Sequence, residues 1–241
     1  MPEPRRPQIG TVLTLPGAAL AELVAEPFDV VWIDLEHGAL DLTAAQDLLV
    51  GAQAAGARAL VRLPADAVRL MAAMLDAGAD GVVLADVRDA ATAAAAAAQL
   101  AHAPAGTRGY GPRRAATRGR TRTGAAPHPS LWAQIESTEG VAAAAEIAAV
   151  PAVDALAVGT SDLSFALGVP RRLDAPELLS AVHAVRAACD GRAAFGVAGA
   201  LDDAPAELLA GADFAIHGTD ARLYATAADQ VASRLLDRLT P

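Results

Sequence analysis

Lysine is missing from this chain of 241 residues, and all 19 of its Lys-plus-Arg side chains are arginines. Arginine keeps its proton at any physiological pH and is a poor imine former. The absence therefore excludes every mechanism that needs a lysine Schiff base, including pyridoxal-phosphate chemistry. It also removes the lysine on which P-loop phosphate binding depends.

Cysteine and long apolar runs are also scarce. The single cysteine, Cys189, excludes an internal disulfide and is typical of a reducing, cytoplasmic location. No apolar run reaches the roughly 20 residues that span a bilayer, and the N-terminus lacks the apolar stretch of a signal peptide. The net charge of −9 argues against nucleic-acid binding. We therefore expect neither a membrane nor a nucleic-acid partner.

Short apolar runs alternate along the chain with segments of helical spacing. The runs predict eight buried parallel strands, at residues 9–15, 30–34, 59–63, 81–84, 131–136, 155–158, 193–197 and 214–217. The intervening segments predict helices at residues 17–26, 43–55, 66–77, 88–102, 139–149, 174–190, 203–210 and 219–238. Eight such pairs predict a single (β/α)8 TIM barrel domain over residues 1–241. A doubly wound sheet is the alternative, but no G-x-G-x-x-G opens a helix.

Polar residues follow four of the predicted strands. In a barrel the chemistry lies at the carboxyl ends of the strands, so these residues should converge on one face. The four strand ends read Asp34-Leu35-Glu36-His37, Arg62-Leu63-Pro64, Gln134-Ile135-Glu136 and Gly159-Thr160-Ser161-Asp162.

Glu136 and Asp162 stand at two consecutive strand ends. Such a pair of carboxylates suits Mg²⁺ or Mn²⁺, which binds one or two carboxylates and keeps several waters for a substrate. Either residue alone could instead cap a helix, since each precedes a helical segment. Because the two occur together, the sequence favours a metal site.

Arg62 and His37 are the other residues that could carry chemistry. An arginine closing an apolar strand needs an anion, which could be a substrate carboxylate or enolate oxygen, or Asp34 or Glu36 in an internal ion pair. His37 follows a strand with two carboxylates beside it, which suits a general base.

The irregular segment 104–130 holds six arginines and no acidic residue; they are Arg108, Arg113, Arg114, Arg118, Arg120 and Arg122. It could be a solvated loop, an oligomer contact or a site for an anionic substrate tail. The first two interpretations are favoured, because "GTRGYG" matches a phosphate-binding loop only loosely.

Several segments in order resemble the HpcH/HpaI aldolase family of metal-dependent class II pyruvate aldolases: FDVVWIDLEHG, LVRLP, MLDAGADGVVL, GTRGYG, AQIESTEGV and VGTSDLSFALG. The resemblance runs over nearly the whole chain. It implies a (β/α)8 barrel that cleaves 4-hydroxy-2-oxo acids into pyruvate and an aldehyde with a divalent metal, Mg²⁺, Mn²⁺ or Co²⁺. It also implies a homo-oligomer, a hexamer built as a trimer of dimers, in which a helix such as 219–238 is exchanged between subunits.

The resemblance further implies roles for individual residues. Glu136 and Asp162 would be the metal ligands, and Arg62 would bind the keto and enolate oxygens of pyruvate. His37, paired with Asp34, would act as base through a metal-bound water.

Further roles follow from the same resemblance. Glu36 would hold metal-bound waters, and Asp76 would reach the site of a neighbouring subunit. The residues expected to bind the substrate besides Arg62 are Gln134, Gly159, Thr160 and Ser161, with the backbone at Gly159 and Thr160 meeting the pyruvate carboxylate.

The sequence departs from the family pattern at four places. Thr160 replaces a frequent proline, and another proline is missing near Ala85. Val12 and Ala198 stand where larger side chains are expected, which would widen the aldehyde side. Two other functions stay open: a citryl- or malyl-CoA type lyase, and a non-catalytic barrel that binds an oxo acid.

Overall fold

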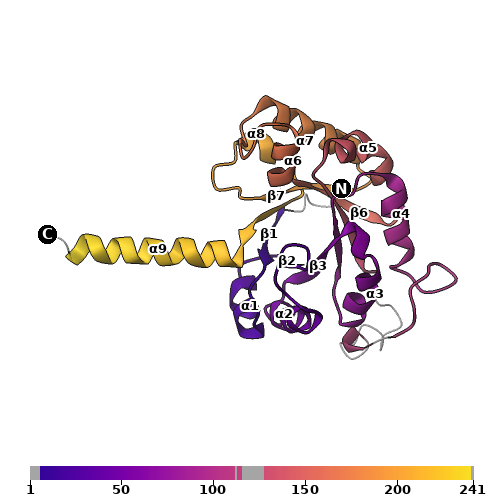
Figure 1. Cartoon of the computed structure of the whole chain (residues 1–241), viewed down its shortest axis with the longest axis horizontal. Coiled ribbons are helices and arrows are strands. Elements are labelled where there is room, and N and C mark those ends of the chain that lie inside the picture. The colour runs from indigo at the N-terminus through magenta and orange to yellow at the C-terminus, as the bar shows by residue number, and fades with distance from the viewer. Residues whose placement is uncertain (1–5, 112, 116–127, 240–241) are drawn as a thin grey trace.

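The computed structural model describes residues 6–111, 113–115 and 128–239. Eight parallel strands pair in chain order and close into a barrel, with β1 hydrogen-bonded to both β2 and β8. Helices surround the barrel on the outside (Figure 1). The predicted (β/α)8 barrel is therefore confirmed, and the doubly wound alternative is wrong because the sheet has no open edge.

The strands lie within two residues of the predicted ones. Their bounds are β1 Gln8–Leu13, β2 Val30–Asp34, β3 Arg58–Pro64, β4 Gly81–Ala85, β5 Ser130–Ile135, β6 Val153–Gly159, β7 Ala194–Gly199 and β8 Phe214–Thr219. The helices are α1 Ala18–Ala25, α2 Leu42–Ala54, α3 Arg69–Asp76 (after the 3₁₀ turn η1 Ala65–Ala67), α4 Ala90–Ala98, α5 Thr138–Ala148, α6 Thr160–Ala166, α7 Pro176–Cys189, α8 Ala206–Leu209 and α9 Asp220–Leu239. The short helix α6 was not among the predicted helix ranges, although a helix start at Asp162 was one interpretation of that residue.

The core has two layers. Apolar side chains on the outer face of the strands pack against the helices, while a smaller cluster fills the barrel itself. Within the barrel Trp132 packs edge-on against Trp32, with ring centroids 6.1 Å apart, and lies 4.3 Å from Phe214. These large rings fill the interior, and a cavity lies on each side of them: one lined by Trp32 and the other by Trp132 and Phe214.

Four aspartates close the amino end of the barrel in a repeated pattern. Each stands at the start of an even-numbered strand and accepts a hydrogen bond from a backbone N–H at or beside the start of the preceding odd-numbered strand. The pairs are Asp29 with Ile9, Asp80 with Ala59, Asp154 with Leu131 and Asp213 with Phe195, at 2.9–3.0 Å. Every second strand junction is thereby fixed at the end opposite to the predicted site.

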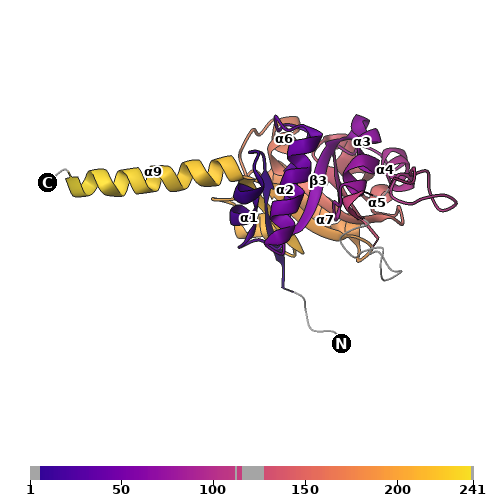
Figure 2. The ribbon, with the colours of Figure 1, turned by 90° about the horizontal axis from the view of Figure 1, so that it is seen from below.

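Helix α9 differs from the other helices because it leaves the barrel. Both views show it projecting from the body as a straight rod (Figures 1 and 2). Its first residue, Asp220, is buried and accepts hydrogen bonds from the backbone of Thr14 and Leu15, which fixes the start of the helix to the segment just after β1. Further along, apolar side chains such as Tyr224 and Leu239 are exposed. Across the described ranges, no helix is both long enough and apolar enough to cross a membrane.

Candidate active site

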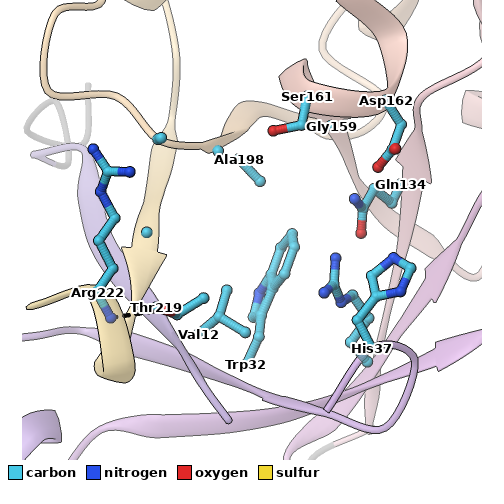
Figure 3. Close-up of a pocket in the computed structure, with 14 residues that line it drawn as sticks. Val12, Trp32, His37, Gln134, Gly159, Ser161, Asp162, Ala198, Thr219 and Arg222 are labelled. Atoms are coloured by element: carbon cyan, nitrogen blue, oxygen red, sulfur yellow. Dashed lines mark hydrogen bonds between the residues drawn. The ribbon is translucent and has the colours of Figure 1, made fainter. Parts of the chain in front are cut away.

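A cavity of about 280 Å³ opens at the carboxyl ends of the strands. Its lining residues are Val12, Trp32, His37, Arg62, Gln134, Gly159, Ser161, Asp162, Ala198, Gly199, Ala200, Gly218, Thr219 and Arg222. Six of these were predicted from the strand ends. His37, Gln134 and Asp162 lie at one side of the cavity and Arg222 at the other, with Val12 and Trp32 between them (Figure 3).

The two sides differ in chemistry and are named here by their residues. The carboxylate side comprises Asp34, Glu36, His37, Arg62, Gln134, Glu136 and Asp162. The small-residue side comprises Val12, Ala198, Gly199, Ala200, Gly218, Thr219 and Arg222.

Arg62 is held by a two-point ion pair with Asp34. The sheet register sets Asp34 of β2 directly beside Arg62 of β3, so that Nε and Nη2 donate to the two carboxylate oxygens at 3.0 and 2.7 Å. Burial opposes ionisation of Asp34, but the hydrogen bonds and charge of Arg62 outweigh it and lower the pKa of that carboxyl. The internal ion pair considered from the sequence therefore exists. Arg62 also lines the cavity, and its second predicted role, the binding of a substrate oxygen, stays a prediction.

Glu36 and His37 extend this cluster toward solvent. Glu36 Oε2 lies 3.4 Å from Arg62 Nε and 3.7 Å from His37 Nε2, and the His37 side chain is 67% exposed. Burial raises the pKa of Glu36, against the opposing charges of Arg62 and His37. The expected pairing of His37 with Asp34 takes another form, because Asp34 Oδ1 accepts the backbone N–H of His37 while the ring lies beside Glu36.

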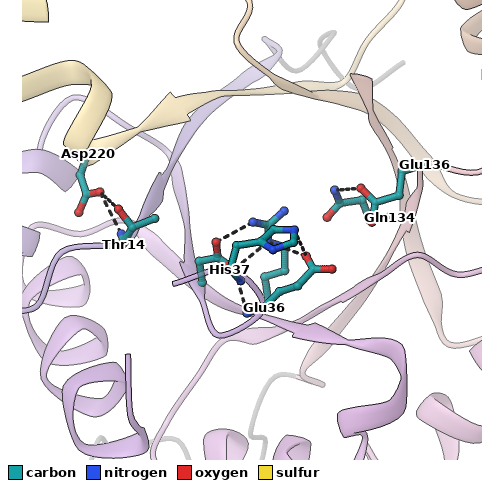
Figure 4. Close-up of polar contacts among 8 residues, drawn as sticks. Thr14, Glu36, His37, Gln134, Glu136 and Asp220 are labelled. Carbon is teal, nitrogen blue, oxygen red and sulfur yellow. Dashed lines mark hydrogen bonds and ion pairs between the residues drawn. The ribbon is translucent and has the colours of Figure 1, made fainter. Parts of the chain in front are cut away.

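Glu136, also on the carboxylate side, is buried and accepts from two donors, of which Figure 4 shows Gln134. Gln134 Nε2 donates to Glu136 Oε2 at 2.5 Å, and the backbone N–H of Asp86 donates to Oε1 at 2.8 Å. Burial, followed by the negative charges of Glu36 and Asp162, raises the pKa of Glu136 to about 7. Gly159 allows this close packing, because a Cβ there would lie 2.4 Å from Glu136 Oε2.

These groups fit a hard divalent cation. Glu36, Glu136 and Asp162 line one cavity beside the mouth, and the electrostatic repulsion among them would be relieved by a positive ion. The Oε1 atom of Gln134 is buried without a hydrogen-bond partner, although the residue lines the mouth. No cluster of three or more His, Cys, Asp or Glu ligands occurs in the described ranges. The ligand pair expected from the sequence, Glu136 and Asp162, with positions left for water or substrate, stays a prediction.

Some predicted residues lie away from the mouth cavity. Asp76, at the end of α3, pairs with Arg108 and lines a separate cavity with Thr43 and Arg113. Arg114 donates to the Gln53 side chain at 2.7 Å. Arg108 and Arg114 therefore make polar contacts within the chain, and Arg113 lines the cavity beside Asp76. The other three, Arg118, Arg120 and Arg122, lie outside the described residues.

Thr160 and Ser161 begin α6, the short helix after β6. Thr160 is buried, and its Oγ1 donates to the carbonyl of Ala198 at 3.1 Å, while Ser161 lines the mouth. The sequence reasoning missed Trp32, Gly218 and Arg222 as cavity residues. Arg222 lies within the first turn of α9, and its signal was an arginine shortly after a strand in "HGTDARLY".

The family model for "HpcH/HpaI aldolase/citrate lyase" matches residues 13–227 of this chain. The chain belongs to this family. It is 32% identical to a hydroxypyruvate/pyruvate aldolase of Rhizorhabdus wittichii, over 94% of this chain and 93% of that protein. It is 34% identical to a 4-hydroxy-2-oxovalerate aldolase of Rhodococcus jostii, over 95% of this chain and 92% of that one.

A solved structure agrees with this assignment. An HpcH/HpaI aldolase/citrate lyase family protein of Burkholderia cenocepacia superposes with a TM-score of 0.84 at 27% identity, covering 95% of each chain. The resemblance recognised in the sequence motifs is confirmed, and with it the prediction that the protein is an enzyme of the carbon–carbon lyase class.

Proposed function

We propose that the protein is a divalent-metal-dependent aldolase that reversibly cleaves 4-hydroxy-2-oxo acids to pyruvate and an aldehyde. The observation that carries this proposal is the carboxylate side of the mouth, where Arg62, Gln134 and the Glu136–Asp162 pair meet in a chain without lysine. A 2-oxo acid can lose a proton from the carbon beside its keto group only if the resulting negative charge is stabilised. Without an imine, that stabilisation falls to fixed cations.

Glu136 and Asp162 would hold the metal, which we take to be Mg²⁺ or Mn²⁺, with Co²⁺ as a further candidate. When bound, the ion supplies a Lewis acid for the oxygens of the 2-oxo acid. Gln134 keeps Glu136 in place through its amide and directs a free carbonyl oxygen to the same region.

Arg62 binds the keto oxygen and stabilises the negative charge that develops on it. Asp34 holds the guanidinium by two hydrogen bonds, so the arginine is oriented before the substrate arrives. At the β6 end, the backbone at Gly159 and Thr160 and the side chain of Ser161 receive the carboxylate of the oxo acid.

His37 is the base that takes up the methyl proton of pyruvate through a water molecule, and returns it in cleavage. Its exposed ring lies beside Glu36, 3.7 Å from one carboxylate oxygen, and that carboxylate would hold water and orient the ring. In this proposal Asp34 positions Arg62 and is not the partner of the His37 ring.

We also propose that the barrel and α9 form one domain that assembles as a hexamer, a trimer of dimers, in the cytoplasm. The exposed apolar side chains of α9 would pack on a neighbouring subunit, and Asp76 would take its part at a neighbour's site. A chain that is monomeric in sedimentation velocity would contradict this part of the proposal.

The proposed function is tested by proton exchange on pyruvate alone. Pyruvate in D₂O with Mn²⁺ or Mg²⁺ is expected to lose its methyl proton signal in NMR, and EDTA is expected to stop the loss. Exchange needs no assumption about the aldehyde. Absence of exchange in folded, metal-supplied protein would overturn the aldolase proposal.

A further inference from the structure

A second cavity continues the mouth on its small-residue side. Its volume is about 490 Å³, and it shares Ser161, Ala200 and Arg222 with the mouth cavity. On the β7 side of the junction the residues are small, since Ala198, Gly199 and Ala200 follow one another at and just after the end of β7, while Ser161 and Arg222 border it elsewhere. Nothing larger than alanine therefore separates the two spaces along that strand end, and a substrate too long for the first cavity can extend into the second.

The wall of this second cavity carries a fixed polar network. Arg222 Nη2 donates to Asp202 Oδ2 at 2.7 Å, and His217 Nε2 lies 3.5 Å from Asp202 Oδ1. His217 Nδ1 in turn accepts the backbone N–H of Leu201 at 3.1 Å. Because the backbone orients the imidazole, and the imidazole and guanidinium both hold Asp202, the network is arranged before any ligand binds.

Arg171 adds a second donor group on the opposite loop. Its backbone adopts a left-handed conformation, with φ of 61°, and its N–H donates to Ser164 Oγ at 2.9 Å. No acidic partner of its side chain occurs among the described residues. Such backbone strain in a residue other than glycine concentrates at functional sites.

The charges of the wall indicate which kind of ligand it fits. Its ionic lining residues are three arginines and three aspartates: Arg171, Arg172, Arg222, Asp174, Asp202 and Asp203. A second anion would gain from the arginines but would be repelled by the carboxylates. A hydroxyl group can donate to a carboxylate and accept from a guanidinium at once, so alternating groups of both kinds match a chain of hydroxyls.

Resting on the proposed function, we propose that the second cavity is the subsite for the distal part of the aldehyde, and that it selects uncharged aldehydes bearing several hydroxyl groups. Arg222, at the junction, is the first specificity-determining residue that such a chain meets. The substrate class is then a 4-hydroxy-2-oxo acid whose remaining carbons are hydroxylated, rather than one with an alkyl or anionic tail.

The test is condensation of pyruvate with three aldehydes of four carbons: erythrose, butanal and succinic semialdehyde. We expect kcat/KM for erythrose to exceed that of each of the others by tenfold or more. In Arg222→Met the ratio of erythrose to butanal should fall about tenfold, and Asp202→Asn should lower it as well. Arg186→Met is the matched control. Arg186, on α7, donates to the carbonyl of Ala210, so this variant should leave the ratio unchanged.

Each outcome has one meaning. Three results would overturn the proposed subsite, provided that pyruvate exchange continues. They are equal use of erythrose and butanal, a preference for succinic semialdehyde, and an erythrose-to-butanal ratio that falls in neither Arg222→Met nor Asp202→Asn. Loss of pyruvate exchange in the wild-type protein overturns the proposed function itself, so the two failures are distinguishable.

Discussion

The two sides of the mouth are built on opposite principles. On the carboxylate side the central side chains are buried and bonded to one another, while His37 and Asp162 at its edge are exposed. Asp34 is 2% exposed and accepts two hydrogen bonds from Arg62, and Gln134 donates to Glu136. On the small-residue side, alanine and glycine leave space, and the polar groups around that space are exposed. The rigid, charged carboxylate side suits the proposed common reactant, pyruvate, whereas the open small-residue side suits an aldehyde whose size and groups can differ.

The largest effect is expected from Arg62→Lys, which attacks the rigid half. A lysine ammonium cannot make both hydrogen bonds to Asp34 and still serve the keto oxygen, so pyruvate methyl exchange should fall by about 10²–10³-fold. Exchange is measured by NMR in D₂O, with circular dichroism to check the fold. Arg186→Lys is the control and should exchange within twofold of wild type. A rate for Arg62→Lys above one tenth of wild type would remove Arg62 from the chemistry.

Glu136→Gln, studied without metal, tests the free-energy cost of ionising the buried Glu136 carboxyl on the carboxylate side. A raised pKa of about 7 in the folded protein means that burial favours the protonated acid, so this stabilising contribution is present at low pH and lost as pH rises toward 7. Between pH 5 and pH 8 in EDTA, wild type should therefore lose about 2–3 kcal/mol of unfolding free energy relative to Glu136→Gln. Urea titrations at the two pH values measure this difference. Equal pH dependence in both proteins would contradict it.

Ala198→Leu probes the open half. Ala198 is nearly buried at the end of β7, and a leucine would fill space that the aldehyde needs. The ratio of kcat/KM for butanal to that for acetaldehyde should fall about tenfold, as expected for the fit of one or two methylenes. Ala198→Ser adds little volume and should change the ratio less than threefold. If Ala198→Leu and Ala198→Ser change the ratio equally, the small-residue side does not hold the aldehyde.

The smallest effect is expected from a substitution at Thr160, which links the carboxylate side to the small-residue side. Thr160 Oγ1 donates to the carbonyl of Ala198, linking the β6 end to the β7 end inside the protein. Thr160→Val should lower the unfolding free energy by about 1 kcal/mol, since a buried acceptor loses its donor while the shape is kept. Urea unfolding measures this loss of unfolding free energy, and Thr226→Val, at an exposed position, is the control. A loss no larger than that of the control would mean that the bond adds nothing.

The barrel could be predicted because its strands are short apolar runs whose order follows the chain. Strand β2 begins and ends at the predicted residues. Helix α6 was missed because seven residues in "TSDLSFA" make barely two turns and carry no clear period. The predicted helix at 66–77 is split into a 3₁₀ turn and α3, a local detail that packing decides.

The carboxylate side could be predicted from strand ends, and the ion pair of Arg62 was among the interpretations, but its partner and the neighbour of the His37 ring were not settled by the sequence. Asp34 meets Arg62 because of the register between β2 and β3, and the turn after β2 directs the His37 ring to Glu36 instead. The open half was harder to predict, because Arg222 comes from a helix and the space around it is made by residues without functional groups.

The central claim is that Glu136 and Asp162 hold one divalent cation for a 2-oxo acid. The most direct test counts bound Mn²⁺ by electron paramagnetic resonance in wild type, Glu136→Gln and Asp162→Asn. We expect one Mn²⁺ per chain in wild type, a change in its spectrum when pyruvate is added, and at least a hundredfold weaker binding in either variant. Unchanged Mn²⁺ affinity in both variants would contradict the claim.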